Sequence, residues 1–159
     1  MKVGIIGGGG REHSICRAIS DSVRVDEIYC IPGNAGTSEI ATNIDLDIDD
    51  FETLRKFIKK NNIDIIIVGP EKPLVGGLVD YLKKNKIKVF GPNKIASKLE
   101  GSKIFTKDLC KKYHIPTASF GVFESLEKSL IFLNQCKFPI VVKADGLASG
   151  KGVYICDTK

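Results

Sequence analysis

The sequence has no long apolar run, no paired cysteine motif and no dense cluster of positive charge. Its apolar runs are far shorter than the roughly 20 residues of a membrane-spanning helix. The first residues predict a strand and not a signal peptide. The five cysteines form no C-x-x-C pair, so we expect reduced, buried thiols in a cytoplasmic protein and neither a disulfide framework nor a zinc site. The net charge of +5 comes with scattered lysines, which favours a solvated surface and an anionic small substrate over nucleic acid.

The composition that remains is that of an ordinary globular protein. Apolar residues make up 43% of the chain and charged residues 27%, which is typical of globular domains. A length of 159 residues suits one domain, or one domain and the beginning of another. We therefore expect the protein to bind small molecules and not nucleic acids or membranes.

The first nineteen residues predict a strand, a glycine turn and a helix. Residues 2–6 are apolar and β-branched, as in a buried strand, and four glycines follow at 7–10. Residues 11–19 then have helical apolar spacing. Amides at the start of such a helix attract an anion, usually a phosphate. Four consecutive glycines favour this interpretation over a turn that binds nothing.

The dinucleotide fingerprint is missing from this turn. In G-x-G-x-x-G counted from Gly7, the third glycine would fall on Glu12. The second predicted strand, 27–31, runs into Pro32 and Gly33 without the acid that holds a ribose. The residues therefore favour a phosphate site over an NAD site. A dehydrogenase is a remote alternative, which binding of NADH would support.

Three predicted strands are followed by a glycine–proline pair, at 32–33, 69–70 and 91–92. In an open parallel sheet the carboxyl ends of the strands form the ligand crevice, so we expect these pairs to line it. Glu71 would lie at its mouth, either as a ligand of ribose hydroxyls or an amine or as a solvated turn residue. The strand at 64–68 is the most apolar and is expected to be central. Further strands are predicted near Ile44 and at 88–90, 139–144 and 153–156, and helices at 51–58, 78–82, 94–99, 103–113 and 126–133.

A second glycine-rich stretch, 145–152, resembles a Walker P-loop without matching it. The P-loop pattern G-x-x-x-x-G-K-S/T requires four residues between its glycines, and Gly146 and Gly150 are separated by three. Gly152 also stands where a hydroxyl is needed for Mg²⁺. We predict the tip of a β-hairpin that closes on phosphates with Lys143 and Lys151; the alternative is an exposed hairpin with solvated lysines.

Taken together, the motifs resemble the glycinamide ribonucleotide synthetase (phosphoribosylamine–glycine ligase) family of ATP-grasp enzymes. They occur in order over nearly the whole chain, and Gly8 replaces a residue that is often polar in the family. The resemblance rests on Gly9-Gly10-Arg11-Glu12-His13, Pro32-Gly33-Asn34-Ala35-Gly36-Thr37, Val68-Gly69-Pro70-Glu71 with Pro73-Leu74, Phe90-Gly91-Pro92, Leu99-Glu100-Gly101-Ser102-Lys103, Phe105-Thr106-Lys107, Lys143-Ala144-Asp145-Gly146-Leu147-Ala148 and Gly150-Lys151-Gly152-Val153.

The resemblance implies a fold and a reaction. The fold would be α/β: a Rossmann-like parallel sheet (the pre-ATP-grasp domain) over residues 1–100, followed by the beginning of an ATP-grasp domain at 101–159. ATP would phosphorylate the carboxylate of glycine, and the amine of 5-phosphoribosylamine would attack the glycyl phosphate. The products would be glycinamide ribonucleotide, ADP and phosphate, with Mg²⁺ or Mn²⁺ required. The alternatives are another ATP-grasp carboxylate–amine ligase and a non-catalytic phosphate- or nucleotide-binding module.

The resemblance also implies two sets of site residues. It places no catalytic residue within the chain and the metal ligands beyond residue 159, so these residues alone are not expected to ligate. The terminal hairpin is then expected to pair with the missing C-terminal part or with another copy. The substrate-binding set is Gly9, Gly10, Arg11, Glu12, Asn34, Gly36, Gly69, Pro70 and Glu71, and the ATP-binding set is Lys107, Lys143, Gly146, Ser149, Gly150, Lys151 and Gly152.

Overall fold

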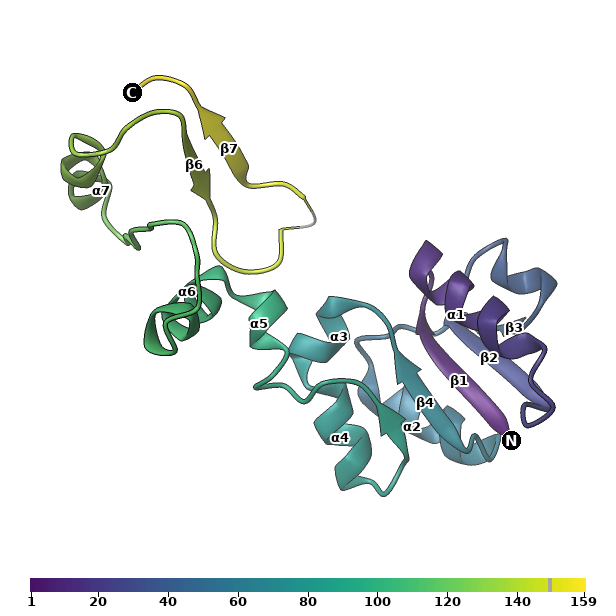
Figure 1. Cartoon of the computed structure of the whole chain (residues 1–159). Coiled ribbons are helices and arrows are strands. Elements are labelled where there is room, and N and C mark those ends of the chain that lie inside the picture. Colours follow the sequence, from purple (N-terminus) through teal and green to yellow (C-terminus); the bar gives the residue numbers. More distant parts are fainter. Residues whose placement is uncertain (149) are drawn as a thin grey trace. The chain divides into compact units, whose positions relative to one another are not determined.

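In the computed structural model, a parallel sheet is built from residues within Met1–Ser97, and a two-stranded antiparallel sheet lies within Lys98–Lys159 (Figure 1). We call these the N-terminal and C-terminal units. The structure describes residues 1–148 and 150–159. In those residues, no helix has both the length and the apolar character that crossing a membrane requires.

The N-terminal unit alternates strands and helices, as the sequence predicts. Its five strands pair in the order β3-β2-β1-β4-β5, and every neighbouring pair is parallel. Parallel neighbours require crossover connections, and helices supply most of them. The elements are β1 (Lys2–Gly7), α1 (Gly10–Ser20), β2 (Glu27–Pro32), the 3-10 helix η1 (Thr37–Glu39), β3 (Thr42–Asn43), α2 (Phe51–Lys60), β4 (Ile65–Val68), α3 (Glu71–Gly76), α4 (Leu78–Lys84) and β5 (Val89–Phe90).

The middle strand is β1 and not β4, so the prediction for 64–68 is wrong in position, but the prediction that this strand is covered on both faces is confirmed. β4 lies between β1 and β5, but both of its faces are covered, which accounts for its apolar sequence. β1 looks less apolar because it carries Gly4. A Cβ at Gly4 would lie 2.5 Å from Cδ1 of Ile66, so the neighbouring strand's side chain fills the space that a side chain at position 4 would occupy.

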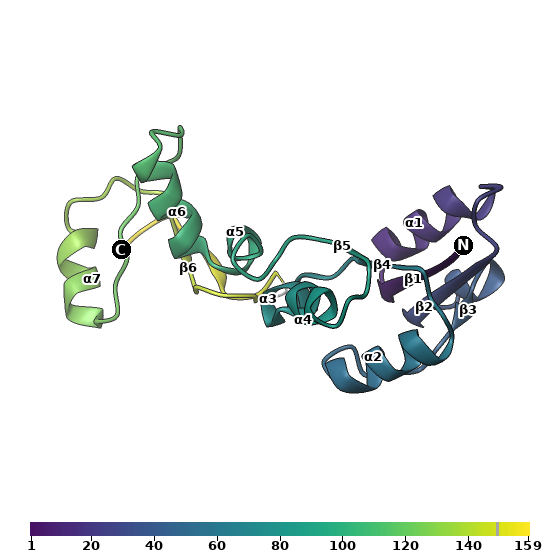
Figure 2. The ribbon, with the colours of Figure 1, turned by 90° about the horizontal axis from the view of Figure 1, so that it is seen from below.

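Helices cover both faces of the parallel sheet (Figure 2). Because side chains alternate along a strand, Val3 and Ile5 of β1 pack in one cluster with Cys16 of α1. Ile6 packs in the other cluster, with Leu54 of α2 and further residues of α4. Each face therefore has its own apolar core, and the strand ends between the two layers are left for the loops.

The prediction that the cysteines are buried, reduced thiols is only partly confirmed. All five are free thiols, but Cys110, Cys136 and Cys156 are half-buried. Cys16 and Cys30 are fully buried, with their Sγ atoms 2.7 Å apart. Burial raises the pKa of both thiols, so they stay protonated at neutral pH.

Two predicted helices have different bounds in the structure. The helix predicted at 78–82 is preceded by α3, and the break between α3 and α4 falls at Gly77, whose φ is +98°. The helix predicted at 94–99 is a turn followed by α5 (Lys98–Gly101). In that turn the carboxylate of Asp80, in α4, accepts the Lys94 N–H at 2.6 Å.

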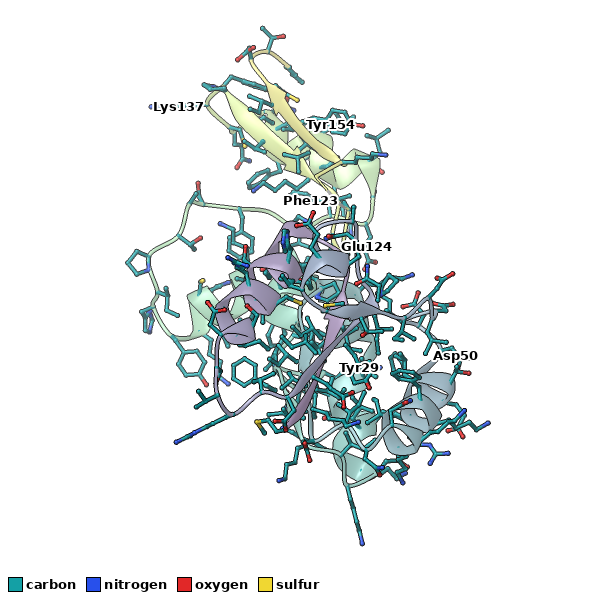
Figure 3. The ribbon with its side chains drawn as sticks, turned by 90° about the vertical axis from the view of Figure 1, so that its right-hand side faces the viewer. Tyr29, Asp50, Phe123, Glu124, Lys137 and Tyr154 are labelled. Atoms are coloured by element: carbon teal, nitrogen blue, oxygen red, sulfur yellow. The ribbon has the colours of Figure 1, made fainter. Side chains whose placement is uncertain are left out.

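The C-terminal unit ends in the predicted hairpin. It also contains α6 (Lys103–Lys112) and α7 (Leu126–Leu133). β6 (Ile140–Lys143) and β7 (Val153–Cys156) pair antiparallel, with Val142 opposite Tyr154. The side chain of Tyr154 projects from this hairpin and is 67% exposed (Figure 3). The hairpin prediction is confirmed, and the P-loop alternative is excluded because the loop joins two strands.

Candidate functional site

Three loops meet where β1, β2 and β4 end. Gly7 of β1 pairs with Pro32 of β2, and Ile6 pairs with Val68 of β4. Because these strands are parallel and in register, the segments that follow them emerge at the same edge of the sheet. They are the glycine turn at 8–11, the loop at 33–37 and the segment at 69–71, which together contain eight of the nine predicted substrate-binding residues; the ninth, Glu12, follows the glycine turn directly.

The glycine turn is open to solvent. Gly8, Gly9, Gly10 and Arg11 are exposed, and α1 begins at Gly10. A Cβ at Gly10 would meet none of the described atoms within 4 Å. Peptide N–H groups in the first turn of a helix have no partner within the helix, so this turn offers donors to an anion.

Not every glycine here leaves room for a ligand. A Cβ at Gly8 would lie 2.6 Å from the carbonyl oxygen of Gly33. A Cβ at Gly36 would lie 2.6 Å from Nδ1 of His13. These two glycines allow the 33–37 loop to approach the glycine turn and α1, which the sequence pattern alone does not distinguish from ligand access.

Asn34 joins the second loop to the glycine turn. Its Nδ2 donates to the carbonyl oxygens of Gly8 at 3.0 Å and Gly9 at 3.3 Å. Its Oδ1 accepts the N–H of Thr37 at 2.9 Å. Thr37 is fully buried, and its Oγ1 accepts the Asn34 N–H and bonds to Asn43, both at 2.7 Å. Thr37, Asn43 and His13 escaped the sequence prediction, although the Asn34-x-x-Thr37 spacing is a signal for side-chain bonding within a turn.

Arg11 reaches across to the third segment. Its Nη1 donates to the carbonyl oxygen of Gly69 at 2.6 Å, and its Nη2 donates to Oε1 of Glu71 at 2.7 Å. Glu71 is the first residue of α3, after Pro70 at its N-cap. The bond from Arg11 lowers the pKa of the Glu71 carboxyl below its usual value of 4.5. Glu71 therefore carries a negative charge beside a guanidinium at the edge of the sheet where β1 and β4 end.

This ion pair predicts how Glu71 titrates. The carboxyl of Glu71, followed by NMR, is expected to have its midpoint below pH 4.5. Because the folded-state pKa is the lower one, the pair stabilises the fold above pH 4.5 and is lost as the pH falls through the folded-state value. Arg11→Gln should return the midpoint toward 4.5, and Arg17→Gln, on the same helix, should leave it unchanged. An unmoved midpoint in Arg11→Gln would contradict the assignment.

The predicted ATP-binding residues lie in the C-terminal unit. Lys143 ends β6, and Lys143 and Lys151 are exposed. Gly146, Gly150 and Gly152 all have positive φ; Ser149 lies outside the described residues. The base of this loop is held by Asp145, whose carboxylate accepts the Ile104 N–H at 3.1 Å. The two lysines thus stand on either side of a loop with one anchored end.

Lys107 already has partners within its own unit. Its Nζ donates to Oγ1 of Thr117 at 2.7 Å and to the carbonyl oxygen of Ala118 at 2.9 Å. It also lies 5.3 Å from the ring centroid of Phe120, a cation–π distance. Lys107 lies within α6, and these contacts hold its ammonium group against the segment that follows the helix.

Family models match both parts of the chain. Residues 1–100 match the model described as phosphoribosylglycinamide synthetase, N domain. Residues 101–159 match its ATP-grasp (A) domain. The chain belongs to the phosphoribosylglycinamide synthetase family. The predicted family and α/β fold are confirmed.

Individual relatives agree with this family. The chain is 49% identical over 157 residues to a phosphoribosylamine–glycine ligase from Clostridium acetobutylicum, covering 99% of this chain and 38% of that protein. It is 50% identical over 155 residues to the one from Caldanaerobacter subterraneus, covering 98% and 37%. The crystal structure of the Thermotoga maritima phosphoribosylamine–glycine ligase superposes with a TM-score of 0.76 at 35% identity, over 99% of this chain and 36% of that one. This member of the phosphoribosylglycinamide synthetase family thus spans well under half the length of these relatives.

Proposed function

We propose that the N-terminal unit binds 5-phosphoribosylamine where β1, β2 and β4 end. The exposed turn at 8–11 allows the 5′-phosphate to approach the positive end of α1. Arg11 adds a guanidinium, and Glu71 supplies acceptors for the ribose hydroxyls or the amine. The meeting of these groups at one edge of the sheet is the observation that carries the proposal.

The proposal extends to the ligation named in the relatives. In a chain of the relatives' length, ATP phosphorylates the carboxylate of glycine, and the amine of 5-phosphoribosylamine displaces phosphate from the glycyl phosphate. Lys143 and Lys151 would neutralise the ATP phosphates as the hairpin closes. In residues 1–148 and 150–159, no three His, Cys, Asp or Glu side chains are grouped to hold a metal ion, so we assign no step to Mg²⁺ or Mn²⁺ here. We place this reaction in the cytoplasm.

Titration of the 159-residue chain with ribose 5-phosphate, a stable analogue of the amine, tests the site. Calorimetry should detect binding of the sugar phosphate, and NMR should show shifts at the amides of Gly9 and Gly10. Gly10→Gln should abolish this binding without changing the melting temperature, because the side chain enters open space and glutamine is a good helix former. Ala18→Gln, exposed on the same helix, should bind like the wild type.

Two outcomes would contradict the proposal. If Gly10→Gln binds ribose 5-phosphate as well as the wild type, the phosphate lies elsewhere. If NADH binds in place of the sugar phosphate, the site is a dinucleotide site. A parallel titration with ATP is expected to show weaker binding, and a coupled ADP-release assay is expected to show no turnover by these residues alone.

A further inference from the structure

Glu12 is the one charged side chain that is buried among the residues the structure describes; it is 4% exposed. It lies at the N-terminal end of α1, directly beneath the open glycine turn. A buried carboxylate needs compensation from hydrogen bonds or positive charge. Its Oε2 accepts the N–H of Gly9 at 2.7 Å, and it lies in the first turn of α1, where the helix dipole favours negative charge.

The side chain of Glu12 runs between the ends of two strands. A Cβ at Gly7, which ends β1, would lie 2.6 Å from Cγ of Glu12. A Cβ at Gly69, directly after β4, would overlap Oε1 and lie 2.7 Å from Cδ. Both strand ends therefore carry glycine where this carboxylate packs against their backbone.

The same two backbone segments carry the exposed groups of the site. Gly9 and Arg11 belong to the glycine turn, and Gly69 leads into Glu71. Arg11 bonds to the Gly69 carbonyl on the exposed side, whereas Glu12 fills the buried side. Arg11 on the exposed side and Glu12 on the buried side together set the spacing between the glycine turn and the Gly69–Glu71 segment.

We infer that Glu12 is a positioning residue that holds the glycine turn and the Gly69–Glu71 segment in register, and that it does not itself touch the ligand. The inference rests on the proposed sugar phosphate site for its functional meaning. Its low exposure separates it from Arg11 and Gly10, which face solvent. Glu12 acts on the ligand only through the two backbones it contacts.

Four variants of the chain test this role: Glu12→Gln, Glu12→Ala, Gly69→Ala and the double variant Glu12→Ala with Gly69→Ala. Glutamine keeps the shape and an acceptor oxygen for the Gly9 N–H, so its dissociation constant for ribose 5-phosphate should stay within about threefold of wild type. Glu12→Ala and Gly69→Ala should each weaken binding about tenfold or more, and the double variant should be no weaker than the worse single variant, because contacting residues are coupled. Asp21→Ala, at the other end of α1, is the matched control.

The amide resonances of Gly69 and Glu71 give a second readout. They should shift in Glu12→Ala and keep their wild-type positions in Glu12→Gln. If Glu12→Ala does not fold, Glu12→Asp replaces it, because a carboxylate one methylene shorter is expected not to reach the Gly9 N–H while it leaves a smaller gap than alanine. Equal losses of affinity in Glu12→Gln and Glu12→Ala, or losses that add in the double variant, would overturn the inference.

The two proposals fail separately. If the wild-type chain does not bind ribose 5-phosphate, the proposed function falls. The positioning role is then decided by the amide shifts and by the stabilities of the four variants. Additive changes in unfolding free energy for residues 12 and 69 would overturn it, and a double variant no less stable than the single ones would support it.

Discussion

Ile66→Ala is expected to lower the free energy of unfolding of the N-terminal unit by about 2–5 kcal/mol, the range for truncating a large aliphatic core residue. Ile66 has no exposed surface and belongs to the apolar cluster beneath α2 and α4. It stands on β4, with paired strands on both sides. The neighbouring backbone is fixed by this sheet, so the cavity cannot collapse fully.

Urea unfolding followed by the NMR signals of residues 1–97 measures this loss. Ile95→Ala is the control, because the Ile95 side chain is 70% exposed and its removal should cost less than about 0.5 kcal/mol. A loss below about 1 kcal/mol for Ile66→Ala would show that the core packs differently from the structure.

Gly33→Ala is expected to destabilise the N-terminal unit by about 2–5 kcal/mol, the sum of backbone strain and overpacking. Gly33 has a φ of +79°, in the left-handed region that a side chain disfavours. The new Cβ would also overlap Oδ1 of Asn43 and lie 2.8 Å from Oγ1 of Thr37. Both atoms belong to the network that holds Asn34 against the glycine turn, so affinity for ribose 5-phosphate should fall as well.

Gly10→Ala provides the comparison for Gly33→Ala. Its Cβ enters open space, and alanine is favourable in a helix, so stability should be unchanged or slightly raised. Thermal unfolding of both variants separates the two kinds of glycine. Similar melting temperatures would mean that the 33–37 loop is looser than the structure shows.

Local pattern predicted the strands, most helices and the hairpin, because their signals lie within a few residues. Strand order depends on contacts between distant segments, and the apolar content of 64–68 was mistaken for centrality. Gly8 and Gly36 are glycine because a neighbouring carbonyl and an imidazole occupy the space of a side chain. Sequence spacing cannot distinguish such a glycine from one that admits a ligand, because the atom that fills the space comes from another segment.

The predicted substrate-binding residues do meet at one edge of the sheet, but their roles differ in ways that spacing does not show. Glu12 belongs to the predicted substrate-binding set, and nothing in the local pattern predicts that its side chain is buried, because charged residues are rarely buried. The Arg11–Glu71 pair joins residues 60 positions apart. Such a contact follows from the parallel register of β1 and β4, which the fold determines.

The outermost strands of the parallel sheet, β3 and β5, are only two residues long each. An outer strand leaves one row of peptide groups unpaired, and long rows recruit strands from other molecules. In β3 and β5 the row of unpaired peptide groups is so short that it can hardly pair with a strand of another molecule. Both edges of the sheet therefore offer little surface for pairing with another molecule. We expect the protein to resist edge-to-edge aggregation in concentrated solution without needing a helix or charged side chains to protect these edges.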